Sequence, residues 1–79
     1  MTRSATMAKL EAIVHHASSV TTPMEESMIL TETYALDSLD LVEIQMKIEV
    51  EFDCKFSVEE DPRLYGTVGE IIDLIEGLT

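Results

Sequence analysis

The chain has 79 residues, 46% of them hydrophobic, and its 16 acidic residues outnumber five basic ones to give a formal net charge of −11. A chain of this length forms one small domain, so we predict a single domain over residues 1–79. The negative charge repels phosphate backbones and anionic headgroups, which disfavours nucleic-acid and membrane-surface roles. No apolar run approaches the roughly 20 residues needed to span a bilayer, and the first residues lack a signal-peptide pattern. We therefore expect a cytoplasmic protein.

The first predicted element is a helix over roughly residues 4–17. Pro23 and the serine and threonine residues around it end the helix, since a proline disfavours helix in the preceding residue. Residues 18–36 are predicted to form a long connection, anchored to the core by the apolar cluster Met28-Ile29-Leu30. The apolar residues of the first helix recur at helical spacing on one face: Met7, Leu10, Ile13, Val14 and Ala17.

Residues 38–52 fit two patterns. Alternating apolar residues such as Val42, Met46 and Val50 are typical of a half-buried strand, whereas a second set is spaced for a helix. The length, the absence of turn residues and a start signal favour the helix: Asp37 or Ser38 can cap it, and acidic residues follow in its first turns. The helical stripe comprises Leu41, Ile44, Ile48 and Phe52.

The end of the chain carries two capping-box patterns, in which a hydroxyl residue precedes a glutamate by three positions. Ser57 to Glu60 predicts a short helix, because a proline follows soon afterwards at position 62. Thr67 to Glu70 opens a last helix with an apolar face, comprising Val68, Ile71, Ile72, Ile75 and Leu78. Three longer helices and a short one predict an all-α fold, a small antiparallel four-helix bundle.

Several residues invite a chemical role but do not support one. His15 and His16 point about 100° apart on a helix and have no evident third ligand, so they indicate a solvated helix end. Cys54 is the single cysteine, which excludes an internal disulfide, and it lacks a convincing histidine partner for nucleophilic chemistry. We expect it to be a small buried residue. The carboxylates lack the spacing of a calcium loop. We predict neither a catalytic residue nor a metal site.

The segment Asp37-Ser38-Leu39-Asp40, at the start of an acidic helix, resembles the attachment motif of the acyl carrier proteins. Three later segments fall at that family's spacing: Val42-Glu43-Ile44, Glu51-Phe52-Asp53 and Thr67-Val68. The resemblance extends from Leu36 to Leu78. The chain departs from it at Tyr34-Ala35-Leu36, where the family usually has a glycine shortly before the aspartate.

The resemblance implies that Ser38 is the attachment residue for a covalent 4′-phosphopantetheine arm, added by a phosphopantetheinyl transferase. Acidic residues are concentrated nearby, with nine carboxylates but only two lysines between positions 37 and 61. They can serve solubility alone, or they can bind basic docking patches on the transferase and on enzymes that load or use the arm. By resemblance, Met46 lines a groove for an acyl chain, although it can equally belong to the core. The implied partner-binding residues are Asp37, Leu39, Asp40, Val42, Glu43, Met46 and Glu49.

The predicted function is that of a monomeric carrier and not of an enzyme. The arm on Ser38 would hold acyl intermediates as thioesters and present them to separate enzymes of fatty-acid or polyketide biosynthesis. Two alternatives stay open: a carrier for aminoacyl or specialised metabolites, and an acidic helical adaptor that is never modified.

Overall fold

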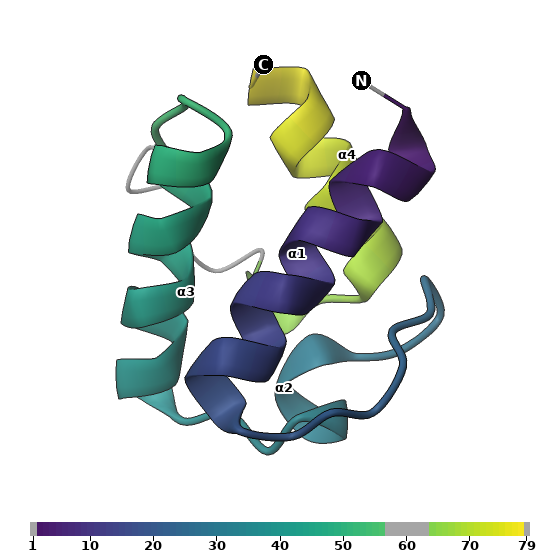
Figure 1. The fold of residues 1–79 in the computed structure, drawn as a ribbon, viewed down its shortest axis with the longest axis vertical. Coiled ribbons are helices and arrows are strands. Elements are labelled where there is room, and N and C mark those ends of the chain that lie inside the picture. The colour runs from purple at the N-terminus through teal and green to yellow at the C-terminus, as the bar shows by residue number, and fades with distance from the viewer. Residues whose placement is uncertain (1, 57–63, 79) are drawn as a thin grey trace.

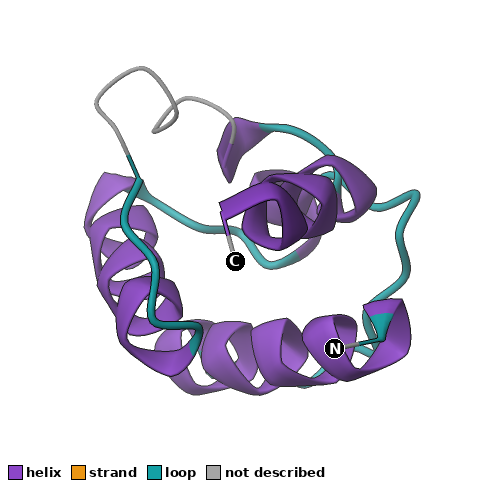
Figure 2. Cartoon of the chain, turned by 90° about the horizontal axis from the view of Figure 1, so that it is seen from above, coloured by secondary structure: helices purple, strands orange, loops and turns teal. Residues whose placement is uncertain are grey.

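The computed structural model describes residues 2–56 and 64–78, which contain four helices. They are α1 (Arg3–Ser18), α2 (Leu30–Thr33), α3 (Ser38–Glu51) and α4 (Val68–Leu78). Figure 1 shows α1 crossing in front of α4 and lying beside α3, with α3 running in the opposite direction to α1. The three longer helices surround a shared interior, which side chains fill (Figure 2). Within the described residues no strand occurs, so the prediction of a small all-α bundle is confirmed.

The described residues contain a short helix that the sequence did not predict. The single turn α2 forms inside the connection 18–36, whereas the short helix expected at Ser57 to Glu60 lies outside the described residues. Its four residues include Thr31 and Thr33, which are weak helix formers, and no side chain caps its start. A turn this short has no periodicity to detect, and it is held by its tertiary contacts.

Burial distinguishes the two patterns of residues 38–52. The predicted helical stripe is buried, whereas Val42, Met46 and Val50 of the strand-like alternation are exposed on α3. In α1, Leu10, Ile13 and Val14 are buried, and Met7 and Ala17 pack against the core as partly buried residues. The apolar face of α4 is buried as predicted, except that Leu78 is only partly buried. The helix interpretation is therefore correct for all three segments.

Side chains cap the starts of α3 and α4. The Asp37 carboxylate accepts a hydrogen bond from the backbone N–H of Asp40, and the Asp40 carboxylate accepts one from that of Asp37. Thr67 and Glu70 form the corresponding reciprocal pair at α4, as the sequence predicts. Each capping box satisfies N–H groups that a helix start would otherwise leave without acceptors.

The connection between α1 and α3 is held at two places. The backbone N–H of Val68 donates to the Met28 carbonyl at 2.8 Å, and Ile29 forms an isolated bridge with Thr67. Nearer α1, the Thr22 carbonyl accepts from the Tyr34 hydroxyl at 2.7 Å and lies 2.8 Å from Nε2 of His15. The Tyr34 ring is buried and its centroid lies 5.8 Å from that of His15. His15 therefore packs against the connection, whereas His16 is solvent-exposed as expected.

Candidate functional site

Ser38 is the first residue of α3 and is exposed to solvent. Asp37 caps the helix, so the Ser38 hydroxyl is not needed as a cap. The backbone N–H groups of Ser38 and Leu39 have no acceptor among the described residues. They can therefore bind an anion attached at Ser38, although the carboxylates of Asp37 and Asp40 lie at the same helix start. The position fits an accessible hydroxyl that accepts a phosphate-linked group.

The turn that leads from α2 to Ser38 uses a left-handed residue, Ala35, with φ of 52°. The N–H of Leu36 donates to the Thr31 carbonyl, and the N–H of Ala35 donates to the Glu32 carbonyl. These two bonds form a Schellman motif in which glycine is the preferred left-handed residue. The structure therefore assigns a backbone role to the position where the acyl carrier protein resemblance expected glycine and this chain has alanine.

Replacing Ala35 by glycine is expected to stabilise the protein by about 0.5–1 kcal/mol. Glycine removes the left-handed strain of alanine, which costs about 1–2 kcal/mol. Part of this gain is lost because glycine gives the unfolded chain more conformational entropy. Urea unfolding followed by circular dichroism measures this difference. Ala8→Gly, an exposed position in α1, is the matched control and should instead destabilise by about 1 kcal/mol. An Ala35→Gly variant no more stable than the parent would show that the turn is unstrained.

An apolar ridge follows the outward face of α3. We define the α3 ridge as Leu39, Val42, Met46 and Val50, whose exposed fractions are 77%, 55%, 60% and 83%. The first three are among the predicted partner-binding residues, and Val50 is not. Its helical spacing after Met46 is the signal that could have identified it. Surface apolar side chains in a continuous row on one helix indicate a docking face.

The predicted acidic residues fall into two groups. Asp37 and Glu43 are exposed beside the α3 ridge, whereas Asp40 and Glu49 are half-buried. The Asp40 carboxylate belongs to the capping box, and Oε2 of Glu49 accepts a hydrogen bond from the Phe56 backbone N–H at 2.9 Å. Glu49 therefore ties α3 to the segment after it, a role that the sequence did not indicate.

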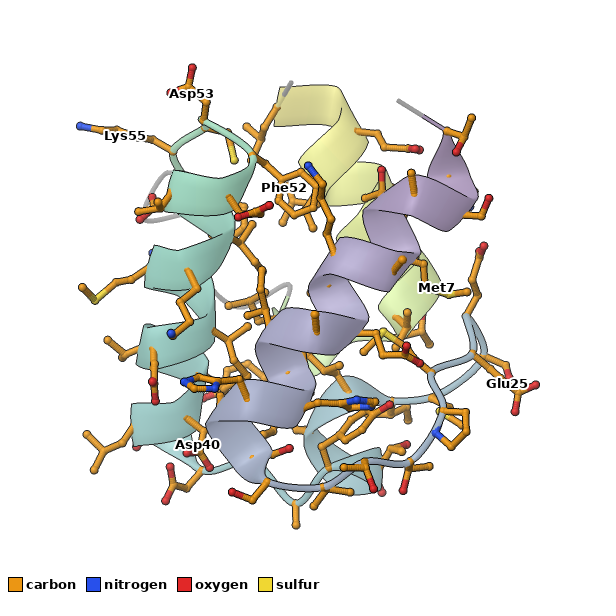
Figure 3. The ribbon with its side chains drawn as sticks, in the orientation of Figure 1. Met7, Glu25, Asp40, Phe52, Asp53 and Lys55 are labelled. Atoms are coloured by element: carbon orange, nitrogen blue, oxygen red, sulfur yellow. The ribbon has the colours of Figure 1, made fainter. Side chains whose placement is uncertain are left out.

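The exposure of Met46 places it outside the core. It borders a depression of about 680 Å³ that opens to solvent beside the end of α3. Figure 3 shows Phe52 pointing toward α1 at this end of α3, whereas Asp53 and Lys55 point away from the molecule. Cys54 is buried as expected. The residues that line the depression are Met46, Glu49, Val50, Asp53, Cys54 and Lys55.

Among residues 2–56 and 64–78, no three histidine, cysteine, aspartate or glutamate side chains come together in an arrangement that could hold a metal ion. None of the described helices is both long and apolar enough to cross a membrane.

Comparison with protein-family profiles gives one finding. Residues 8–75 match the family described as the phosphopantetheine attachment site. The match covers 68 of 79 residues and includes α2, α3, the Ser38 turn and most of α1 and α4. Domains of this family bear covalent 4′-phosphopantetheine and act as carriers, not as catalysts. The exposed serine at the start of a capped helix agrees with this match, and the chain belongs to the family of phosphopantetheine-dependent carrier proteins.

Proposed function

We propose that Ser38 carries the 4′-phosphopantetheine arm and that the protein presents acyl groups on it as thioesters. The observation that carries this proposal is the exposed Ser38 hydroxyl at the start of α3, within Asp37-Ser38-Leu39-Asp40. In the modification, the Ser38 oxygen forms a bond to phosphorus, the phosphoanhydride bond of coenzyme A breaks to release adenosine 3′,5′-bisphosphate, and a base of the transferase takes the hydroxyl proton. The chain supplies an accessible oxygen, and the transferase supplies the catalytic groups.

Co-expression with a broad-specificity phosphopantetheinyl transferase tests this assignment. We expect the intact mass to increase by one phosphopantetheine, and fragmentation of the modified peptide to place the group on Ser38. An unchanged mass would favour the unmodified helical adaptor, and a group on another serine would reject the proposed residue.

We further propose that the N-terminal part of the α3 ridge and the carboxylates around it form the docking face for the transferase and for acyl-handling enzymes. Asp37, Asp40 and Glu43 are acidic groups close to Ser38, and basic patches on partners would complement them. Complementary charge mainly accelerates encounter and fixes orientation. Because Glu49 is half-buried and bonded to Phe56, we expect it to contribute less to docking than Glu43 does.

Glu43→Gln is expected to lower kcat/KM for phosphopantetheine transfer by about 1.5- to 5-fold at low ionic strength, the equivalent of one exposed charge pair. The difference should shrink as salt is added, because salt screens exposed charges. Initial rates measured across a salt series provide the test. Glu25→Gln makes the same charge change in the connection, where the side chain points away from the molecule (Figure 3), and should have a smaller effect. Equal rates for the two variants would indicate that the α3 carboxylates are only solvated.

We base the proposed type of carrier on the motif around Ser38. Asp37-Ser38-Leu39-Asp40 is closer to the fatty-acid and polyketide carriers than to the peptidyl type, so we propose a cytoplasmic, monomeric carrier of acyl groups. Loading the modified protein from a panel of acyl and aminoacyl thioesters separates this function from a carrier for aminoacyl groups.

A further inference from the structure

A groove between α1 and α3 gathers basic side chains on a strongly acidic protein. The depression has a volume of about 430 Å³ and is lined by Lys9, Ala12, Ile13, His16, Lys47, Val50 and Glu51. We name these residues the α1/α3 groove. Two lysines and one glutamate give it a positive balance, whereas the whole chain has a formal charge of −11. Negative charge elsewhere on the chain repels anions, so a positive groove is a distinct local feature.

Lys47 has no ion-pair partner in the part of the chain that the structure describes. It lies four residues after Glu43 and four before Glu51, the spacing at which helical charge pairs form. Glu51 is instead 3.6 Å from Nζ of Lys9, and Lys9 also lies over the Phe52 ring at 5.7 Å. The Lys47 ammonium therefore lines the groove with its charge uncompensated by a direct contact.

The floor and outer edge of the groove are apolar. Ala12 and Val50 are exposed, and Ile13 lies beside them. Val50 is also the last residue of the α3 ridge, so the groove and the ridge form one continuous surface. Lys47 lies nine residues after Ser38, which places it about 14 Å along α3 and about 180° around the helix axis. The α1/α3 groove is thus on the flank of α3 opposite to the attachment residue.

From this arrangement we propose that the α1/α3 groove is a second docking surface, for an amphipathic segment of a partner protein that carries carboxylates beside an apolar side chain. One carboxylate pairs with Lys47, another competes with Glu51 for Lys9, and the apolar side chain covers Val50 and Ala12. A small anion is a poorer fit, because one exposed charge pair contributes little and the rest of the chain repels it. A segment that also buries apolar area gains a second, salt-independent contribution.

This surface gives α3 two opposite charge preferences. Near Ser38 the helix is acidic and complements a basic partner. About two and a half turns later, on the side of α3 that faces α1, the groove complements an acidic segment. A partner that satisfies both can dock in one orientation along α3, since a reversed partner would place like charges together.

Binding is tested by titrating the unmodified protein with a designed helical peptide that carries leucine on one face and glutamate on both flanks. Amide chemical shifts are measured by nuclear magnetic resonance at physiological ionic strength. We expect saturable shifts at the groove residues, including Lys9, Ile13 and Lys47. A matched peptide with glutamine in place of glutamate, and the double variant K9Q/K47Q, should each bind about tenfold more weakly, as expected for two lost charge pairs. K55Q removes an exposed lysine outside the groove and should leave the affinity unchanged.

Three results would overturn the proposal: absence of saturable shifts, equal affinity for the glutamine peptide, or shifts that map away from the groove. Octanoate is titrated in parallel. If this small carboxylate gave the same saturable shifts at similar concentrations, the groove would be a site for small anions and not for a protein segment. Ser38 takes no part in the measurement, so its outcome does not depend on whether the arm is attached there.

Discussion

Replacing Ser38 by alanine is expected to abolish phosphopantetheine attachment while leaving the fold and its stability intact. The loss should be complete, because alanine has no oxygen to form the phosphodiester. Intact mass after co-expression with a transferase measures attachment, and thermal unfolding followed by circular dichroism measures the fold.

The structure gives the reason that stability should not change. Asp37, and not Ser38, supplies the side-chain cap of α3, and the Ser38 side chain is exposed. Alanine is also the best helix former. We therefore expect the free energy of unfolding to change by no more than about 0.5 kcal/mol, as for ordinary surface substitutions.

Asp37→Ala is the matched variant at the neighbouring position. It removes the cap, which should cost about 0.5–2 kcal/mol, but it keeps the Ser38 hydroxyl, the proposed attachment group. This variant should therefore be less stable than the parent and still become modified. Continued modification of Ser38→Ala would place the arm on another residue, and unfolding of that variant would show that Ser38 has a structural role absent from the described contacts.

The helices that could be predicted from sequence are those with a long apolar stripe and a side-chain cap. In α3, Ile44 and Ile48 mark the buried face, and Asp37 marks the start. In α4, Thr67 and Glu70 make the start equally clear. These signals are local, because both the periodicity and the cap lie within a few residues along the chain. The candidate attachment residue, Ser38, was identified differently, from the resemblance of Asp37-Ser38-Leu39-Asp40 to the attachment motif of the acyl carrier proteins.

The three longer helices end within one residue of the predicted bounds, but the left-handed residues that follow the helices could not be predicted, because the usual glycine is absent. Ser19, Ala35 and Asp53 take positive φ values of 62°, 52° and 52°, and no described glycine does so. Asp53 follows α3 in a turn where the Cys54 N–H donates to the Glu49 carbonyl, as in the Schellman motif after α2. An Ala, Ser or Asp at such a position gives no reliable signal of a left-handed turn.

Contacts between distant segments were also beyond sequence reasoning. Nothing local indicates that His15 and the Tyr34 hydroxyl converge on the Thr22 carbonyl, or that Glu11 accepts a hydrogen bond from the Met24 backbone N–H. The α1/α3 groove is a similar case, because Lys9 and Lys47 are 38 residues apart in the chain. Helix packing, which depends on three-dimensional shape, brings these groups together.

Two runs of the sequence place carboxylates close together, Glu49, Glu51 and Asp53 in one and residues 59–61 in the other, where like charges repel one another. Residues 59–61 lie outside the described part of the chain. In the other run, Glu49 bonds to the Phe56 N–H and Glu51 is 3.6 Å from Lys9, so two of its three carboxylates have partners. The largest compensation of negative charge in the described residues lies at the start of α1.

Arg3 joins three segments of the chain at that end. Its guanidinium contacts Glu26 of the connection at 2.8 Å and Asp73 and Glu76 of α4 at 2.6 and 3.2 Å, and it also donates to the Gly69 carbonyl. Gly69 permits this approach, since a Cβ there would lie 3.2 Å from Oε1 of Glu26. Hydrogen bonding to Arg3 lowers the pKa of Glu26, and bonds to Glu26 and Asp73 raise the pKa of Arg3. A single cation thus holds three carboxylates together.

Arg3→Gln is expected to lower the unfolding temperature at pH 7 more than any other single lysine or arginine substitution in the described residues. The variant leaves Glu26, Asp73 and Glu76 close together without their shared cation, so these carboxylates repel one another in the folded state. Lys55→Gln is the matched control, because it removes one positive charge from an exposed side chain that forms no ion pair with the described residues. Thermal unfolding of parent and variants is followed by circular dichroism.

The pH dependence of the difference in unfolding temperature between the parent and Arg3→Gln identifies the source of that difference. The pKa of Glu26 is lowered in the fold, so its pairing with Arg3 contributes fully above the unfolded-state pKa and is lost as pH falls through the folded-state value. The gap between parent and Arg3→Gln should therefore be widest near pH 7 and narrow in acid. Added salt should narrow it at pH 7 as well, since these side chains are partly exposed and salt screens their charges. A variant that unfolds at the same temperature as Lys55→Gln, or a gap that does not change with pH, would show that the three contacts of Arg3 do not hold α1, the connection and α4 together.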